Sequence, residues 1–309
     1  MWFWLALTAL LCWSGSDLFS KIGCRGNDKY AHLKMVIAVG IVMGVHALYT
    51  IFVGGTVVTW HIAMVYLPVS LLYISSMTLG YIGLRYIELS ISSPICNSSG
   101  ALVAVLCFLT GTLDDAIEGN TRLAVIGAVA LVCIGVIALG ITESNEDEEL
   151  RRARQDESNR HYAKSWLAIA LPVIYCLLDA LGTFADSRVL EKLGEELADA
   201  CNVAYELTFL VMGIACAIYV LGIKKQRLIP KQEGPKYLGA VCETIGQFFY
   251  IYALADTEHV AFAAPIISSY CVASVIWGRI FLKEKLSKKH YACIALVVAG
   301  IVIMGILDI

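Results

Sequence analysis

The sequence has little charge and little proline, and it lacks the patterns of the common soluble classes. Only 16% of its 309 residues are charged and six are proline, whereas 59% are hydrophobic. This composition excludes an ordinary soluble domain and indicates an integral membrane protein. The net charge is −3, and no basic stripe alternates with aromatic residues, so we expect no nucleic-acid partner.

Metal-binding and catalytic motifs are also missing from the sequence. Its eleven cysteines form no C-x-x-C, and all except Cys24 stand singly in apolar runs, so we interpret them as small packing residues. The six histidines are scattered, only His46 lies well inside an apolar run, and no H-E-x-x-H occurs. We therefore expect no metal, no cofactor and no enzymatic activity.

Long apolar runs fill most of the chain. The first has no positive charge before it, and the apolar pattern continues after it, so we interpret it as a mature span rather than a signal peptide. Most of the runs are long enough as helices to cross about 30 Å of hydrocarbon. They predict an all-α integral membrane protein with ten transmembrane helices, at residues 2–20, 35–55, 60–84, 89–110, 123–141, 165–185, 198–223, 237–255, 260–278 and 291–307.

A charged segment divides these spans into two sets of five. Residues 142–164, TESNEDEELRRARQDESNRHYAK, alternate acidic and basic side chains and have no apolar face to pack, which is typical of a solvated linker. The predicted units are residues 1–141, the linker 142–164, and residues 165–309.

The two units share weak similarities in the same order. A shift of 171 residues aligns YIGLRYIELSISSPI (81–95) with YALADTEHVAFAAPI (252–266), and a shift of 162 aligns Asp17 with Asp179. GVIALG (135–140) corresponds to GIVIMG (300–305). These matches predict an internal duplication, and an odd number of spans per unit predicts that the two repeats are inverted.

The basic residues give the expected orientation. Of the 23 lysines and arginines, only Arg122, Arg188 and Lys192 fall in the loops after the even-numbered spans. The rich side is expected to be cytoplasmic, which places both termini outside the cytoplasm and the protein in the plasma membrane, the inner membrane of a cell.

With this arrangement, the chain resembles the ten-helix EamA-type branch of the drug/metabolite transporter (DMT) superfamily. The resemblance rests on the two inverted halves, on the Pro-Ile pairs at 94–95 and 265–266, and on the ending FLKEKLSKKHYACIALVVAGIVIMG. In the first half, LDDAIEGN replaces the usual Gly-Glu-x-Leu turn. The resemblance implies a central cavity lined mainly by spans 1–4 and 6–9, with spans 5 and 10 at the periphery, and secondary transport of small metabolites or drugs without ATP.

Four carboxylates lie in apolar sequence and are the first candidates for a binding site. Asp17 and Asp179 fall near the middle of spans 1 and 6, and Glu206 and Glu243 lie in spans 7 and 8. Ionisable groups at such depth are costly unless they face a wet cavity or a partner. The alternatives are an Asp17–Lys21 pair one helical turn apart, and packing of the two glutamates through Asn202 or Gln247.

Aromatic and small polar residues accompany these carboxylates. Carboxylates beside aromatic faces suit an organic cation, and a carboxylate could instead bind a proton and couple transport to the proton gradient. Prolines 94 and 265 should kink spans 4 and 9 near polar side chains, although serine hydroxyls could heal those kinks. The further candidates for substrate or proton binding are Trp13, Tyr175, Tyr205, Tyr250, Asn97, Gln247, Ser268 and Ser269.

The sequence therefore predicts a secondary active transporter that works by alternating access, with a small-molecule substrate, surrounding lipid and protons as its partners. An organic cation or amine with proton coupling is the leading hypothesis. Export of neutral or amphipathic metabolites such as amino acids, and a passive channel, stay open as alternatives. Either a monomer or a homodimer is compatible with the sequence.

Overall fold

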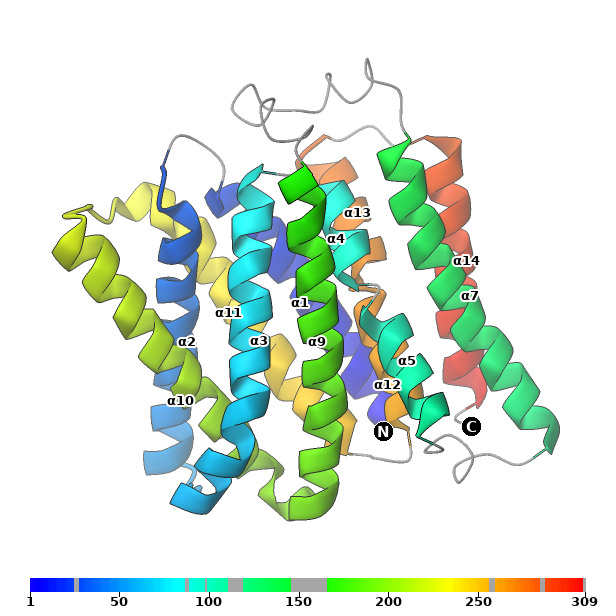
Figure 1. Cartoon of the computed structure of the whole chain (residues 1–309), viewed down its shortest axis with the longest axis horizontal. Coiled ribbons are helices and arrows are strands. Elements are labelled where there is room, and N and C mark those ends of the chain that lie inside the picture. Colours follow the sequence, from blue (N-terminus) through cyan, green and yellow to red (C-terminus); the bar gives the residue numbers. More distant parts are fainter. Residues whose placement is uncertain are drawn as a thin grey trace.

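A computed structural model describes residues 1–24, 28–86, 89–97, 99–110, 119–145, 166–255, 259–283 and 287–307. Within these ranges the chain is helical and contains no strand. Most of the linker at 142–164 lies outside the described residues. The helices run roughly along one another as a bundle, and the two chain ends lie at the same end of it (Figure 1).

The first half of the bundle begins with three long helices, α1 (Trp2–Cys24), α2 (Ala31–Phe52) and α3 (Trp60–Tyr86). They are followed by the short helices α4 (Leu89–Asn97) and α5 (Ser99–Leu109), and then by α7 (Gly119–Ser144). The second half contains α9 (Trp166–Leu193), the short 3₁₀ turn η2 (Glu195–Leu197), α10 (Ala198–Ala217), the π-helical segment η3 (Ile218–Ile223), α11 (Pro230–Ala255), α12 (Val260–Ser268), α13 (Tyr270–Phe281) and α14 (Lys288–Leu307).

Within the described ranges, six helical segments are long and apolar enough to cross a membrane. Their outward side chains include strongly exposed apolar residues such as Val45, Leu177 and Val211. A surface of this kind is unfavourable in water and suited to lipid. The chain is therefore a multi-pass membrane protein. The six segments are Trp2–Cys24, Ala31–Phe52, Trp60–Arg85, Ala170–Leu193, Ala198–Ile223 and Pro230–Ala255.

The main packing contacts join one half of the chain to the other. Helix α1 packs against α11, α3 against α9, α2 against α10, and α7 against α14. Two of these contacts depend on glycine. A Cβ on Gly40 of α2 would lie 2.6 Å from the carbonyl oxygen of Phe209 in α10, and one on Gly300 of α14 would lie 2.8 Å from that of Ala128 in α7. Larger residues there would push the paired helices apart.

The predicted spans 4 and 9 are each interrupted. Helices α4 and α5 are separate, with α4 ending at Asn97 and α5 beginning at Ser99, and α12 and α13 are separated at Ser269. The hydroxyl of Ser269 donates to the carbonyl oxygen of Ile266 at 2.6 Å, so it satisfies a backbone acceptor at the break. Both helix ends lie about one turn after Pro94 and Pro265. A proline leaves unpaired the carbonyl one turn before it, so the ends do not lie at the carbonyls that these prolines free.

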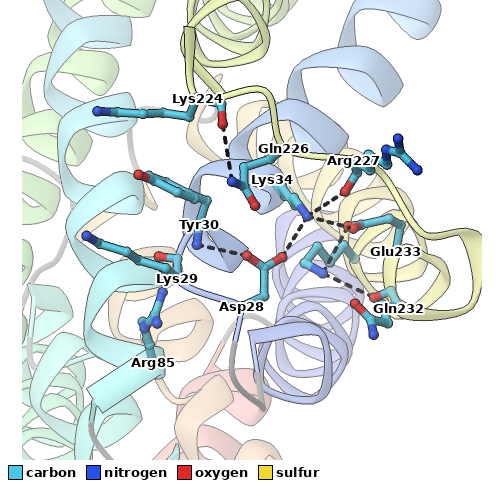
Figure 2. A network of polar contacts seen from close by, with 11 residues as sticks. Asp28, Lys29, Tyr30, Lys34, Arg85, Lys224, Gln226, Arg227, Gln232 and Glu233 are labelled. Atoms are coloured by element: carbon cyan, nitrogen blue, oxygen red, sulfur yellow. Dashed lines mark hydrogen bonds and ion pairs between the residues drawn. The ribbon is translucent and has the colours of Figure 1, made fainter. Parts of the chain in front are cut away.

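An ionic cluster of Asp28, Lys34, Glu233 and Lys236 lies at the end of the bundle where α2 and α11 begin. Figure 2 shows Asp28, Lys34 and Glu233 of this cluster. The Lys34 ammonium lies 2.7 Å from the Asp28 carboxylate and 3.4 Å from that of Glu233, and Lys236 lies 2.9 Å from Glu233. Lys34 also donates to the carbonyl oxygen of Arg227 at 2.9 Å. These bonds link α2, α11 and both preceding loops.

The charge of Asp28 is favoured by this cluster. Partial burial alone would raise the pKa of Asp28, but the hydrogen bond from the Lys34 ammonium and the one from the backbone N–H of Tyr30 outweigh it. The pKa of Asp28 is therefore held below its ordinary value. Asp28 therefore remains ionised at neutral pH.

Candidate functional site

A pocket lies among the helices in the middle of the bundle. Its lining residues come from α1, α3, α4, α9, α10, α11, α12 and α13, and none of those described comes from α2, α7 or α14. The pocket holds about 870 Å³ of space not filled by atoms, including space open to solvent. It lies next to the interrupted helices, which end or begin at its wall. Such a position is typical of small-molecule sites in membrane carriers.

Asp17 of α1 is held at this pocket by two hydroxyls. Ser93 of α4 donates to its Oδ2 atom at 2.8 Å, and Ser274 of α13 donates to the same atom at 2.9 Å. Lys21, one turn further along α1, donates to the carbonyl oxygen of Leu84 at 3.0 Å. Asp17 thus connects α1 to one segment of each interrupted helix.

Asp179 of α9 contacts the other side of the first interruption. Ser99 donates to its Oδ2 atom at 2.7 Å. Ser99 is the first residue of α5, so this bond joins α9 to α5. Asp17 therefore contacts α4 through Ser93, and Asp179 contacts α5 through Ser99.

Glu243 of α11 is the third carboxylate of the pocket, and it is hydrogen-bonded by Ser16. Three other polar groups of the lining have no hydrogen-bond partner among the described residues, namely Trp13 Nε1, the Tyr81 hydroxyl and Gln247 Nε2. Buried polar groups are nearly always paired in folded proteins. These three atoms are therefore available to a polar ligand.

Aromatic rings form much of the remaining wall. The Trp13 ring centroid lies 4.9 Å from that of Tyr250 and 5.9 Å from that of Tyr270. Tyr73 contacts both Tyr205 and Tyr250 edge to face, with ring centroids 5.8 and 6.0 Å apart. The faces and edges of these rings surround a space that also contains the carboxylates.

The lining is unbalanced in charge. Asp17, Asp179 and Glu243 contribute three carboxyl groups, and the described lining residues include no lysine, arginine or histidine. The pocket differs in this respect from the ionic cluster, in which two lysines accompany two carboxylates. A cation, a proton or a polar solute is what this arrangement can bind.

The structure brings most of the sequence candidates together, with three exceptions. The pocket lining contains Asp17, Asp179, Glu243, Trp13, Tyr175, Asn97, Gln247, Tyr205 and Tyr250. Ser269 is buried elsewhere, and the side chain of Ser268 lies outside the described part of the structure. Glu206 points away from the pocket, because α10 turns it toward α2, where its carboxylate lies 2.8 Å from His46 Nδ1.

Sequence reasoning missed several residues that the structure places at or beside the pocket. Tyr73 and Tyr81 line the pocket from α3, an apolar helix whose charged residue, Arg85, lies in its last turn and gave no sign of a pocket. Asp186 was missed because the sixth span was expected to end at residue 185, whereas α9 continues to Leu193. A spacing of seven residues puts Asp186 on the same face of α9 as Asp179, and that spacing was the available signal.

Comparisons with known proteins give a family for the second half of the chain. Residues 189–306 match the model of the EamA-like transporter family, which confirms the resemblance to the DMT superfamily. The match indicates a membrane transporter of small solutes and is consistent with a protein that is not an enzyme. No curated protein sequence matches the chain.

A solved structure extends the likeness of fold to almost the entire chain. A crystal structure described only as that of a protein is similar over 98% of this chain and 96% of its own, with a TM-score of 0.63 and 14% sequence identity. At this identity the likeness concerns the fold alone. The fold of the first half is therefore shared with a known structure, although the family model matches only the second.

Proposed function

Because its second half matches the EamA-like transporter family, we propose that this membrane protein is a secondary active transporter that moves a small organic cation by alternating access. The observation that carries the proposal is the central pocket, which combines Asp17, Asp179 and Glu243 with aromatic rings and has no basic residue in its described lining. Coulomb attraction and cation–π contact can together replace the water that a cation loses on entering.

The proposed architecture is ten spans in two inverted repeats. The helix pairing supports it, because exchanging the two halves converts the α1–α11 contact into the α3–α9 contact, while the α2–α10 and α7–α14 contacts each convert into themselves. The helix ends between α4 and α5 and between α12 and α13 fall at corresponding places in spans 4 and 9, which is compatible with a repeat. The uneven distribution of lysine and arginine between the loops of the two sides favours both termini outside the cytoplasm.

In this proposal the pocket carboxylates act at the interrupted helix. A cation bound between Asp17 and Asp179 replaces hydroxyl donors as the partner of each carboxylate, and those donors, Ser93 and Ser99, are on α4 and α5. Filling the pocket therefore changes the hydrogen bonds on both sides of the break. A ligand can shift a conformational equilibrium only through such differences in contact between the two states.

A zwitterionic metabolite such as an amino acid is the second candidate substrate. Trp13 Nε1 and Gln247 Nε2 are donors without a partner among the described residues, and both line the pocket. Two free donors could bind the carboxylate of an amino acid whose ammonium group faces Asp17 or Asp179. The two candidates differ only in whether the substrate carries a negative group.

The test is counterflow in liposomes containing the purified protein. Labelled tetraethylammonium should accumulate transiently when the vesicles are preloaded with the unlabelled cation, and it should equilibrate slowly when they are empty. A channel would show no dependence on preloading. A panel of unlabelled amines and amino acids as competitors then distinguishes the two substrate classes, and inhibition by amino acids alone would overturn the cation proposal.

A further inference from the structure

Asp186 is a fully buried carboxylate outside the pocket, and its exposed fraction is 0%. Tyr66 of α3 donates to its Oδ1 atom at 2.5 Å, and Tyr73 of the same helix donates to its Oδ2 atom at 3.4 Å. Among the described residues, no ion pair includes Asp186. A carboxylate without a counterion in a membrane-spanning segment is costly to keep ionised, and such residues are usually functional.

A chain of hydroxyl groups connects Asp186 to the pocket. The Tyr73 oxygen, besides its contact with Asp186, is hydrogen-bonded to the hydroxyl of Tyr250 and lies 3.3 Å from the Thr183 oxygen. The Tyr250 hydroxyl lies 2.9 Å from the Thr183 oxygen. Tyr73, Thr183 and Tyr250 line the pocket, whereas Tyr66 and Asp186 do not.

The position of Asp186 along α9 shows toward which end of the bundle the hydroxyl groups lead. Seven residues of helix separate it from Asp179, a rise of about 10 Å toward the end of the bundle where α9 finishes. That end is also the one that holds the beginning of α1 and the end of α14 (Figure 1). The hydroxyl chain therefore leads from the pocket toward the proposed extracytoplasmic side.

Among the described residues, the titratable groups near Asp186 are neutral at ordinary pH. They are Tyr66 and Tyr73 from α3, Tyr205 and Cys201 from α10, and Tyr250 from α11. On α9, the helix that carries Asp186, the carboxyl group that lines the pocket is that of Asp179. No described lysine, arginine or histidine is among these neighbours, so a proton is the species that can neutralise Asp186 in place.

We infer that Asp186 is the binding site for a coupling proton, and that Tyr73, Thr183 and Tyr250 carry this proton between Asp186 and the substrate pocket. The inference rests on the proposed transport function and adds the coupling ion to it. The pocket carboxylates then serve the substrate, while Asp186 serves the proton. Separate sites allow each to be altered without removing the other.

The transfer is balanced because each hydroxyl gains one proton when it loses one. Protonated Asp186 gives its proton to the Tyr73 oxygen, Tyr73 passes its own proton to Tyr250 or Thr183, and that hydroxyl releases one to a group or water in the pocket. The carboxylate remains on Asp186 and no tyrosinate accumulates. The reverse sequence loads Asp186 from the pocket.

The first test measures protonation directly and needs no substrate. Infrared difference spectra of the full-length protein in lipid, recorded while the pH is changed, should contain the C=O band of a carboxylic acid that is absent from Asp186→Asn and present, displaced, in Asp186→Glu. Tyr66→Phe should move the pH at which the band titrates, because Tyr66 bonds the same carboxyl. An unchanged titrating band in Asp186→Asn would overturn the inference.

The second test measures coupling with tetraethylammonium, which has no titratable proton. Asp186→Asn should lose accumulation driven by a pH gradient but keep counterflow at equal pH, since substrate exchange needs no net proton movement. Tyr73→Phe, which removes one hydroxyl of the chain, should slow gradient-driven accumulation more than Tyr66→Phe, which does not interrupt it. The same gradient-driven rate in both tyrosine variants would count against the relay.

The two proposals fail separately in these tests. If the unaltered protein shows no counterflow of tetraethylammonium, the cation proposal fails, and the infrared titration still decides whether Asp186 binds a proton. If counterflow is present and Asp186→Asn retains full gradient-driven accumulation, the cation proposal stands and Asp186 is not the coupling site. Should Asp186→Asn fail to fold, Asp186→Glu and Tyr73→Phe provide both readouts.

Discussion

The pocket and the ionic cluster both contain carboxylates, but these carboxylates have different partners in the two regions. In the cluster, Lys34 and Lys236 lie within ion-pair distance of Asp28 and Glu233. In the pocket, Asp17 and Asp179 accept hydrogen bonds from serine hydroxyls. The carboxylates of the cluster are therefore neutralised by lysines of the protein, whereas those of the pocket would be neutralised only by a bound cation or proton.

Helix α11 contains both arrangements and allows a direct comparison. Glu233 lies in its first turn and belongs to the cluster, and Glu243 lies ten residues later and lines the pocket. Both are buried glutamates on one helix, with exposed fractions of 4% and 9%. Their difference therefore comes from their neighbours, and it separates a stabilising role from a binding role.

The largest effect on transport is expected from removing a charge of the pocket. Asp17→Asn keeps the size of the side chain and its hydrogen-bonding capacity, so the protein should fold with nearly normal thermal stability. Loss of the attraction to a bound cation, about 2 kcal/mol or more, should reduce tetraethylammonium counterflow roughly thirtyfold. Asp179→Asn should behave in the same way. Full activity in the folded Asp17→Asn variant would remove this aspartate from the site.

The matched glutamate variants should show opposite losses. Glu233→Gln leaves Lys236 and Lys34 with fewer counterions in a buried position, which should cost about 3–5 kcal/mol of stability. Glu243→Gln removes a carboxylate that has no described basic partner, so its melting temperature should stay close to normal while counterflow falls. Melting temperature and counterflow of the folded fraction are to be measured on both. Equal destabilisation would mean that the two regions do not differ as described.

The positions of the helices could be predicted from the sequence, whereas their ends could not. Apolar runs mark the part of a helix that contacts lipid or the core, and every predicted run contains helix in the described residues. Polar turns at the ends are not marked, so α9 extends beyond residue 185 and α11 begins at Pro230 rather than at 237. Asp186, Glu233 and Lys236 all lie in these unpredicted turns.

The sequence also could not predict toward which neighbour a side chain points. Depth in an apolar run selected Asp17, Asp179 and Glu243, which line the pocket, but it selected Glu206 equally, and Glu206 contacts His46 instead. Which face of a helix looks inward depends on the packing of its neighbours, here α10 against α2. Tyr73 shows the converse, because a tyrosine in an apolar run gives no sign that its hydroxyl will meet an aspartate 113 residues away.

A smaller effect is expected from acid on the ionic cluster. The pKa of Asp28 is lower in the folded protein than its ordinary value of 3.8, because hydrogen bonds from Lys34 and Tyr30 outweigh its burial. Its contribution to stability is therefore present above that value and is lost as the pH falls through the lower folded pKa. Melting temperatures should show a stability advantage over Asp28→Asn above about pH 4 that shrinks below it. A constant difference across that range would contradict the assignment.

The smallest effect, and the one with the opposite sign, is expected from a hydroxyl that bonds Asp17. Ser93→Ala removes one of the two donors to its Oδ2 atom and leaves the other, from Ser274, in place. The empty site then solvates the carboxylate less well, so a cation that takes the place of the lost donor gains about 1 kcal/mol. The KM for tetraethylammonium should fall roughly fivefold, and release should slow, so kcat should fall as well. Ser274→Ala is the matched control on the other interrupted helix and should give a similar fall in KM. If the hydroxyls only hold the helices in position, KM would instead rise in both variants.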